Sequence, residues 1–214
     1  MKWTHKNRSK IKPASLAVFF LCIYPWSRYS LSGLIDLGGP YALYIFEIFL
    51  GLFGLLLMRP GGLRRSAPHP IRLVAPLLAA GFGTGLIVFL CARIMGLAIP
   101  FDLNDKQTIF ALLIIAPIVE ELIFRGLLWR SMEILKIESR HIMWITTLLF
   151  ALAHFEAFSR VGAEIKIYVL YQTVYVIPLS ILCASARLRS LNIYYSVSVH
   201  FLFNLAFYLG SYIL

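Results

Sequence analysis

Apolar residues run in long stretches along almost the whole chain, and short polar segments separate one stretch from the next. Each stretch is close to the ~20 residues that a helix needs to cross the hydrocarbon core of a bilayer. The first is the least regular, because Pro25 and Arg28 interrupt its second half. The pattern predicts seven membrane helices, over about residues 13–35, 41–58, 73–95, 107–129, 141–158, 165–186 and 191–213.

No long linker, low-complexity tract or internal repeat divides the chain. We therefore expect one all-α domain over residues 1–214, a polytopic bundle of about seven transmembrane helices. Only 14% of the residues are charged and 60% are hydrophobic, whereas a soluble protein carries about 25% charged residues. Cys22, Cys91 and Cys183 lie far apart in apolar stretches, so their spacing favours neither a disulfide framework nor a zinc cluster.

The net charge of +10 would suggest nucleic acid in a soluble protein, but membrane topology explains it better here. With a cytoplasmic N-terminus, five Lys and Arg residues fall outside, namely Arg28, Arg93, Lys106, Arg160 and Lys166. Arg125 lies within the fourth helix, and the remaining 14 of the 20 basic residues fall on the cytoplasmic side. We expect a cytoplasmic N-terminus, an uncleaved first helix and no nucleic-acid partner.

A few ionisable residues lie inside the predicted helices, where each charge costs about 2.5–3.5 kcal/mol and faces the bundle interior as a rule. Glu47 is alone on its helix and is expected to be structural. Glu121 and Arg125 are spaced i, i+4 and can pair along one face of the fourth helix. Glu120 points about 100° away from Glu121. A buried carboxyl without a partner on its own helix suits a general base, although a packing role is the simpler alternative.

Two histidines lie at similar depth on other helices. Phe150 and His154 are one turn apart on the fifth predicted helix, and His200 and Asn204 are one turn apart on the seventh. A single buried histidine is more often structural than catalytic. Two histidines, an asparagine and a glutamate on three helices indicate a functional site, because ionisable residues in membrane spans are usually functional.

These residues form a three-part pattern, "EELIFR" at 120–125, "FALAH" at 150–154 and "HFLFN" at 200–204. The pattern resembles the CAAX-protease and bacteriocin-processing family, also called the abortive-infection family, whose members are intramembrane endopeptidases. All three family motifs, Glu-Glu-x-x-x-Arg, Phe-x-x-x-His and His-x-x-x-Asn, are present in order. The resemblance covers the second half of the chain, about residues 107–214, as the catalytic core.

The resemblance implies a role for each matched residue. Glu120 and His154 would hold and deprotonate a water that attacks a peptide carbonyl. His200 and Asn204 would stabilise the resulting oxyanion. Glu121, Arg125 and Phe150 would support these catalytic residues.

Dependence on a metal stays open at this point. Glu120, His154 and His200 would supply three ligands to zinc and leave one position for water. The chain has no HExxH motif and places an asparagine beside the site, so a metal-free glutamate mechanism without cofactor is favoured.

Other functions fit the pattern less well. An aspartyl protease needs two aspartates within helices, but Asp36, Asp102 and Asp105 fall in predicted outer loops. No helix carries a rhomboid-type serine motif. A proton-coupled transporter is the principal alternative, because glutamates and histidines also form proton relays, but repeated halves are not visible. A non-catalytic scaffold or immunity protein of the same fold is the third.

The expected partners are the lipid bilayer and a membrane-anchored protein or peptide substrate. The candidates are a prenylated CAAX-like peptide, a bacteriocin leader and the anchor helix of a sorted surface protein. The small size and basic charge resemble bacterial members of the family, so the expected location is the bacterial inner (plasma) membrane.

Overall fold

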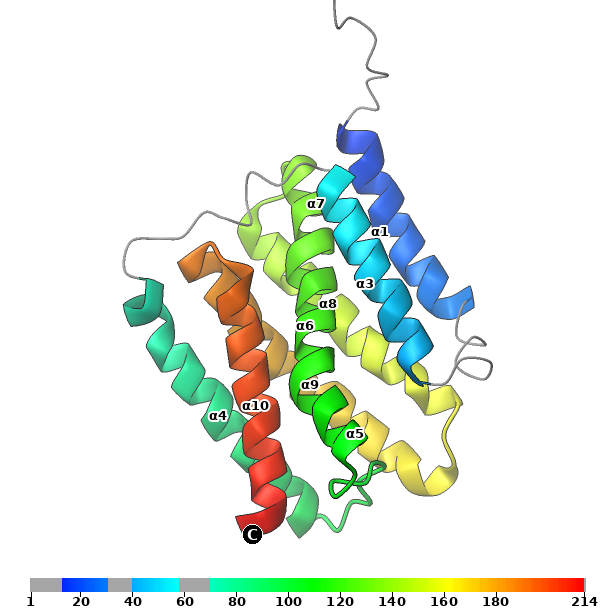
Figure 1. Ribbon diagram of the computed structural model, residues 1–214, viewed down its shortest axis with the longest axis vertical. Coiled ribbons are helices and arrows are strands. Elements are labelled where there is room, and N and C mark those ends of the chain that lie inside the picture. Colours follow the sequence, from blue (N-terminus) through cyan, green and yellow to red (C-terminus); the bar gives the residue numbers. More distant parts are fainter. Residues whose placement is uncertain (1–12, 31–39, 58–69, 214) are drawn as a thin grey trace, which may run out of the picture.

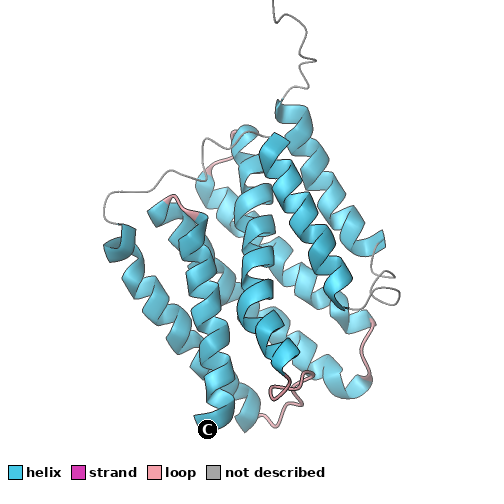
Figure 2. Cartoon of the chain, in the orientation of Figure 1, coloured by secondary structure: helices cyan, strands magenta, loops and turns pink. Residues whose placement is uncertain are grey.

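Every regular element in the described part of the chain is a helix (Figure 2). The computed structural model describes residues 13–30, 40–57 and 70–213. The helices are α1 (Pro13–Ser30), α3 (Pro40–Leu57), α4 (Pro70–Ile94), α5 (Lys106–Phe110), α6 (Ala116–Glu121), α7 (Trp129–Ile134), α8 (Ser139–Phe155), α9 (Ala163–Ser190) and α10 (Ile193–Ile213). Two π-helical segments are η1 (Ala111–Ile115) and η2 (Leu122–Leu128), and a 3-10 helix is η3 (Glu156–Ser159). The predicted all-α fold is confirmed.

The segment from α5 to α7 is one continuous helical rod, because η1 and η2 join its α-helical parts without a break. It begins after Asp105, whose carboxylate accepts hydrogen bonds from the backbone N–H and the hydroxyl of Thr108, both at 2.8 Å. These hydrogen bonds hold the pKa of Asp105 below its ordinary value. The rod ends at Ile134, five residues beyond the predicted end of the fourth helix.

Five helical stretches are long and apolar enough to cross a membrane: Pro70–Ile94, Lys106–Ile134, Ser139–Ser159, Ala163–Ser190 and Ile193–Ile213. In α1 and α3 the apolar parts described are shorter, Ala14–Tyr24 and Tyr44–Phe53. The end of the first predicted helix, beyond residue 30, and Asp36 lie outside the described residues. Large apolar side chains such as Ile94 and Val174 point outward, as expected for a surface in contact with lipid. The protein is therefore a helical membrane bundle.

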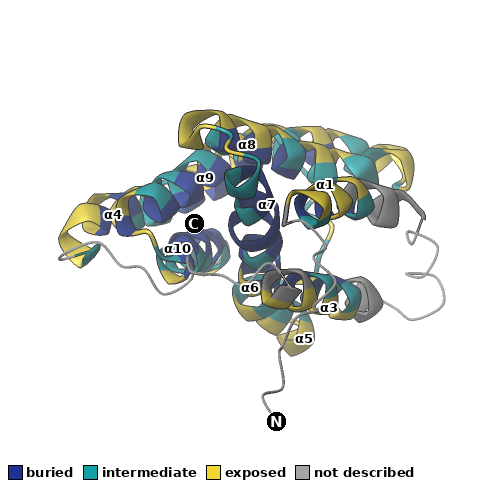
Figure 3. Ribbon diagram, turned by 90° about the horizontal axis from the view of Figure 1, so that it is seen from above, coloured by how far each residue is buried: buried dark blue, intermediate teal, exposed yellow. Residues whose placement is uncertain are grey.

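The central rod α5–α7 has other helices on either side of it and behind it (Figure 1). α4 and α10 lie on one side of it, α1 and α3 lie on the other, and α8 and α9 cross behind. Seen from above, the ribbon around α7 is dark with buried residues, whereas the outer faces of α4, α8 and α1 are exposed (Figure 3). The helix with the two glutamates and the arginine is thus the core of the bundle.

Small residues let α4 and α10 approach closely. Gly81 and Gly85 are spaced i, i+4 on α4, a spacing that brings membrane helices into backbone contact. A Cβ atom on Gly81 would lie 3.1 Å from the carbonyl oxygen of Val199, and one on Gly85 would overlap the carbonyl oxygen of Phe203. Gly210 makes the same kind of approach to the ring of Phe89. This contact fixes α10, which carries His200 and Asn204.

We predict that Gly85→Ala lowers the thermal unfolding midpoint. The added methyl group would overlap the backbone of α10, which cannot move aside as a side chain can. Overpacking of this kind costs about 1–3 kcal/mol. Gly83→Ala is the matched control on the same helix, since no atom lies within 4 Å of its Cβ position. Helix propensity alone favours alanine at both positions by about 1 kcal/mol. Equal midpoints for the two variants in detergent would contradict the close contact.

Candidate active site

A cavity of about 570 Å³ lies inside the bundle, and side chains from several helices line it. Glu120 of α6, His154 of α8, and His200 and Asn204 of α10 all belong to its wall. The structure therefore brings the four predicted catalytic side chains together around one space. The supporting residues Glu121 and Arg125 do not line the cavity, and both are buried behind it.

The central rod changes its winding on both sides of the two glutamates. η1 and η2 are π-helical, and α6, which ends in Glu120 and Glu121, lies between them. π-helical turns are rare and occur frequently at functional sites. Glu120 has a side chain that is 20% exposed and faces the cavity, while that of Glu121 is fully buried. The two adjacent carboxyl groups thus face different surroundings, as their 100° separation predicts.

Arg125 is the buried cation of the site and is held on several sides. Its Nη1 donates to Glu121 Oε1 at 3.1 Å, which confirms the predicted i, i+4 pair. Its Nη2 donates to the carbonyl oxygen of Ser180 at 2.7 Å and to the Ser180 hydroxyl at 2.6 Å. The Ser180 hydroxyl in turn donates to Thr147 Oγ1 at 3.1 Å. The guanidinium thereby joins the central rod to α9 and α8.

His200 lies between the two glutamates. Its Nδ1 is 3.0 Å from Glu121 Oε1, and its Nε2 is 3.7 Å from Glu120 Oε2. An ionised carboxylate only accepts hydrogen bonds, so the Nδ1 atom that meets Glu121 carries a hydrogen. Glu120, which has no partner on its own helix, therefore has one on α10.

His154 is oriented by its own helix. Its Nδ1 lies 2.9 Å from the carbonyl oxygen of Phe150, and since a carbonyl only accepts, this nitrogen carries the hydrogen. In the neutral ring, Nε2 is then the basic nitrogen. The centroid of the Phe150 ring lies 4.7 Å from that of His154 and 6.0 Å from that of His200. The Cζ atom of Arg125 lies 5.2 Å from the same centroid, above the ring. Phe150 thus packs against both histidines and the buried cation.

Asn204 ties α10 to the first π-helical turn. Its Nδ2 donates to the carbonyl oxygen of Leu112 at 2.8 Å. This bond fixes the orientation of the carboxamide and uses one of its two amide hydrogens. The second amide hydrogen is the one that a substrate oxygen would meet.

The side chains that could bind a metal ion do not cluster as the predicted zinc ligands Glu120, His154 and His200. Among the described residues, Glu121, Cys183 and His200 are the three whose ligand atoms all lie within 4.8 Å of one another. Glu120 and His154 do not belong to this group. The Glu121 oxygen nearest His200 also accepts from Arg125, whose positive charge opposes a second cation there.

The sequence did not reveal the residues that contact Glu121 and Arg125 from the neighbouring helices. Ser180 accepts from Arg125 and donates to Thr147, and Cys183 lies beside Glu121, yet the sequence did not single out any of them for the site. A buried guanidinium requires acceptors on neighbouring helices, and the hydroxyl residues of α8 and α9 were the signal for them. Glu47 was expected to be structural, but it lines the same cavity as Glu120.

Residues 104–206 match the family model described as "Type II CAAX prenyl endopeptidase Rce1-like". The match contains all three motifs and begins after α4, so the first three described helices lie outside it. No curated protein and no solved structure matches the chain. Over residues 104–206 the chain is similar to this family of CAAX prenyl endopeptidases, the family that its motifs resemble.

Proposed function

We propose that the protein is an intramembrane endopeptidase that hydrolyses a peptide bond of a membrane-anchored or lipidated protein, with a water activated by Glu120 and His154. One observation carries the proposal: three helices place two histidines, an asparagine and a carboxyl group on the wall of one cavity inside the bundle. The family match supports the reaction class. The substrate bond would enter this cavity from the bilayer.

Glu120 is the group that takes the proton from the attacking water. It is the cavity-facing member of the glutamate pair, so it is the one that water and a substrate can reach. The basic Nε2 of His154 accepts the second hydrogen bond of that water and aligns it. The water oxygen then bonds to the carbonyl carbon, and Glu120 passes the proton to the leaving amine as the C–N bond breaks.

His200 and Asn204 stabilise the oxyanion that forms when water attacks. His200 donates Nδ1–H to Glu121, and its Nε2 edge faces Glu120 and the cavity. We assign the contacts with the oxyanion to this edge of His200 and to the Asn204 amide. Glu121 and Arg125 act through His200 and position it, since Glu121 holds the ring and Arg125 neutralises Glu121.

The mechanism uses no metal. Among the described residues, the group with ligand atoms close enough for a metal is Glu121, Cys183 and His200, and it includes neither Glu120 nor His154. The Glu121 oxygen of that group is already bound by Arg125 and His200. A zinc ion there would meet a guanidinium in a region of low dielectric, where repulsion between cations is strong.

We predict that Glu120→Gln lowers peptide cleavage by about 100- to 10,000-fold, because it removes the base and keeps the shape. His154→Ala and His200→Ala should abolish cleavage, and Asn204→Ala should cost about 100- to 1000-fold as the loss of one oxyanion donor. The assay is turnover of a membrane-anchored fluorogenic peptide in liposomes. Glu138→Gln, at an exposed glutamate before α8, is the control and should keep full activity.

Two results would reject this assignment. Wild-type turnover by the Glu120→Gln protein would remove the general base. Absence of cleavage together with Glu120-dependent proton flux in the same liposomes would instead identify a transporter.

We predict that protein dialysed against a strong chelator keeps its peptidase activity and holds far less than one zinc ion per chain by elemental analysis. Metal ligands must be deprotonated, so a zinc enzyme would lose both its metal and its activity under chelation or at low pH. A known zinc peptidase dialysed in parallel is the control. Activity that is lost on dialysis and restored by stoichiometric zinc would make Glu120, His154 and His200 ligands.

A further inference from the structure

A second carboxyl group reaches the cavity from α3, outside the segment that matches the family. We propose that Glu47 determines substrate specificity by binding a cationic group of the substrate, a Lys or Arg side chain or an amino group, close to the scissile bond. This inference rests on the proposed function and specifies that the substrate carries a positive charge near the bond that is cleaved.

The burial of Glu47 is the first argument. Glu47 is only 3% exposed and lies on a helix of mainly apolar residues. It lines the same cavity as Glu120, His154 and His200. A carboxyl group is costly inside a membrane, and such groups usually face a functional cavity. Burying Glu47 in the membrane costs free energy that the apolar residues around it do not cost, and Glu47 faces the cavity.

The depth of Glu47 is the second argument. α3 and the central rod run in the same direction (Figure 1). Gly51 marks their contact, because a Cβ atom there would lie 2.8 Å from Cγ of Leu122. Glu47 precedes Gly51 by four residues and Glu120 precedes Leu122 by two, so the two carboxyl groups differ in depth by roughly 3 Å at 1.5 Å per residue. A substrate that meets Glu120 is thus within reach of Glu47.

The charge of the cavity wall is the third argument. Its lining residues include two glutamates, Glu47 and Glu120, but no Lys or Arg among the described residues. Arg125 is close by, but it is bound to Glu121 and Ser180 and does not line the cavity. Two carboxyl groups in a low dielectric attract a cation and repel an anion. The wall therefore favours a basic substrate residue over an acidic one.

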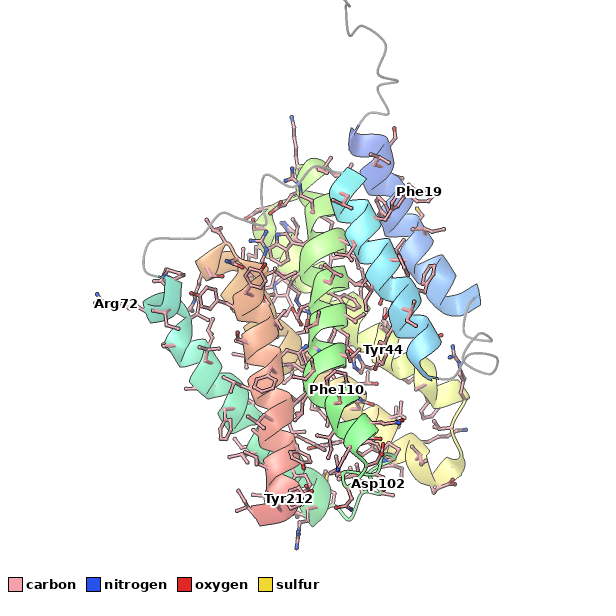
Figure 4. All side chains as sticks on the ribbon, in the orientation of Figure 1. Phe19, Tyr44, Arg72, Asp102, Phe110 and Tyr212 are labelled. Carbon is pink, nitrogen blue, oxygen red and sulfur yellow. The ribbon has the colours of Figure 1, made fainter. Side chains whose placement is uncertain are left out.

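Aromatic residues beside Glu47 complete the surface. Tyr44 precedes Glu47 by one turn on the same face of α3, and it also lines the cavity, as does Tyr24 of α1. Figure 4 shows Tyr44 at the lower half of α3, next to the central rod. Tyrosine rings attract Lys and Arg through cation–π contacts. A carboxyl group with neighbouring tyrosines is a surface suited to a basic side chain.

The test uses the full chain in nanodiscs and membrane-anchored peptides that differ at one position. Each peptide carries a single Lys, Gln or Glu, moved in turn through the residues that flank the scissile bond. Cleavage is measured with the wild-type protein, and binding is measured by fluorescence anisotropy with Glu120→Gln. We expect the Lys peptide to exceed the Glu peptide by at least about tenfold in kcat/KM and in affinity at one position.

Glu47→Gln, which keeps the side-chain shape, should reduce the ratio of kcat/KM for the Lys peptide to that for the Glu peptide to within about threefold. Glu47→Lys should reverse the preference toward the Glu peptide. Glu138→Gln, at the exposed glutamate used above, is the control and should keep the preference for Lys.

The outcomes separate the two proposals. Cleavage with a Lys preference that Glu47→Gln does not change, or with no preference at any position, would overturn the role of Glu47 and leave the endopeptidase intact. Binding that favours Lys through Glu47 without any cleavage would support the specificity site and overturn the proposed function. Neither binding nor cleavage of any peptide would overturn both.

Discussion

The arrangement of the site depends on one buried guanidinium. Arg125 is 1% exposed in the middle of the bundle, and a cation there must be surrounded by acceptors and by negative charge. Glu121 on the same rod, Ser180 on α9 and the Phe150 ring on α8 provide them. Because Glu121 also holds His200, the position of α10 depends on the same cation. One side chain thus links four parts of the bundle.

This link divides the work between two adjacent carboxyl groups. Glu121 is engaged by Arg125 and His200 and has no access to the cavity. Glu120 is turned about 100° from it and faces the space that a substrate would fill. The motif places two identical residues side by side, and helix geometry alone gives them different surroundings. A charge-neutral support behind an accessible carboxyl group agrees with the proposed role of Glu120 as a general base.

The helices were predictable because a bilayer demands about 20 apolar residues per span. The pairs Glu121–Arg125 and Phe150–His154 were predictable as well, since residues four apart share a helix face. Contacts between helices were less accessible. Ser180 meets Arg125 only through the packing of α9, and the sequence alone does not tell which hydroxyl group of the neighbouring helices will lie beside the guanidinium. Glu47 reaches the cavity because Gly51 lets α3 approach Leu122. The π-helical segments of the central rod could not be predicted either, because no residue pattern in the sequence marks them.

The most direct measurement of this account is a double-mutant cycle on thermal unfolding and cleavage with Glu121→Leu and Arg125→Met. Each single variant leaves a buried charge without its partner, which costs about 3–5 kcal/mol, whereas replacing both partners is often close to neutral. We expect the double variant to be more stable than either single variant and still inactive, because His200 has lost its support. A double variant that cleaves like the wild type, or whose losses of stability simply add, would contradict the account.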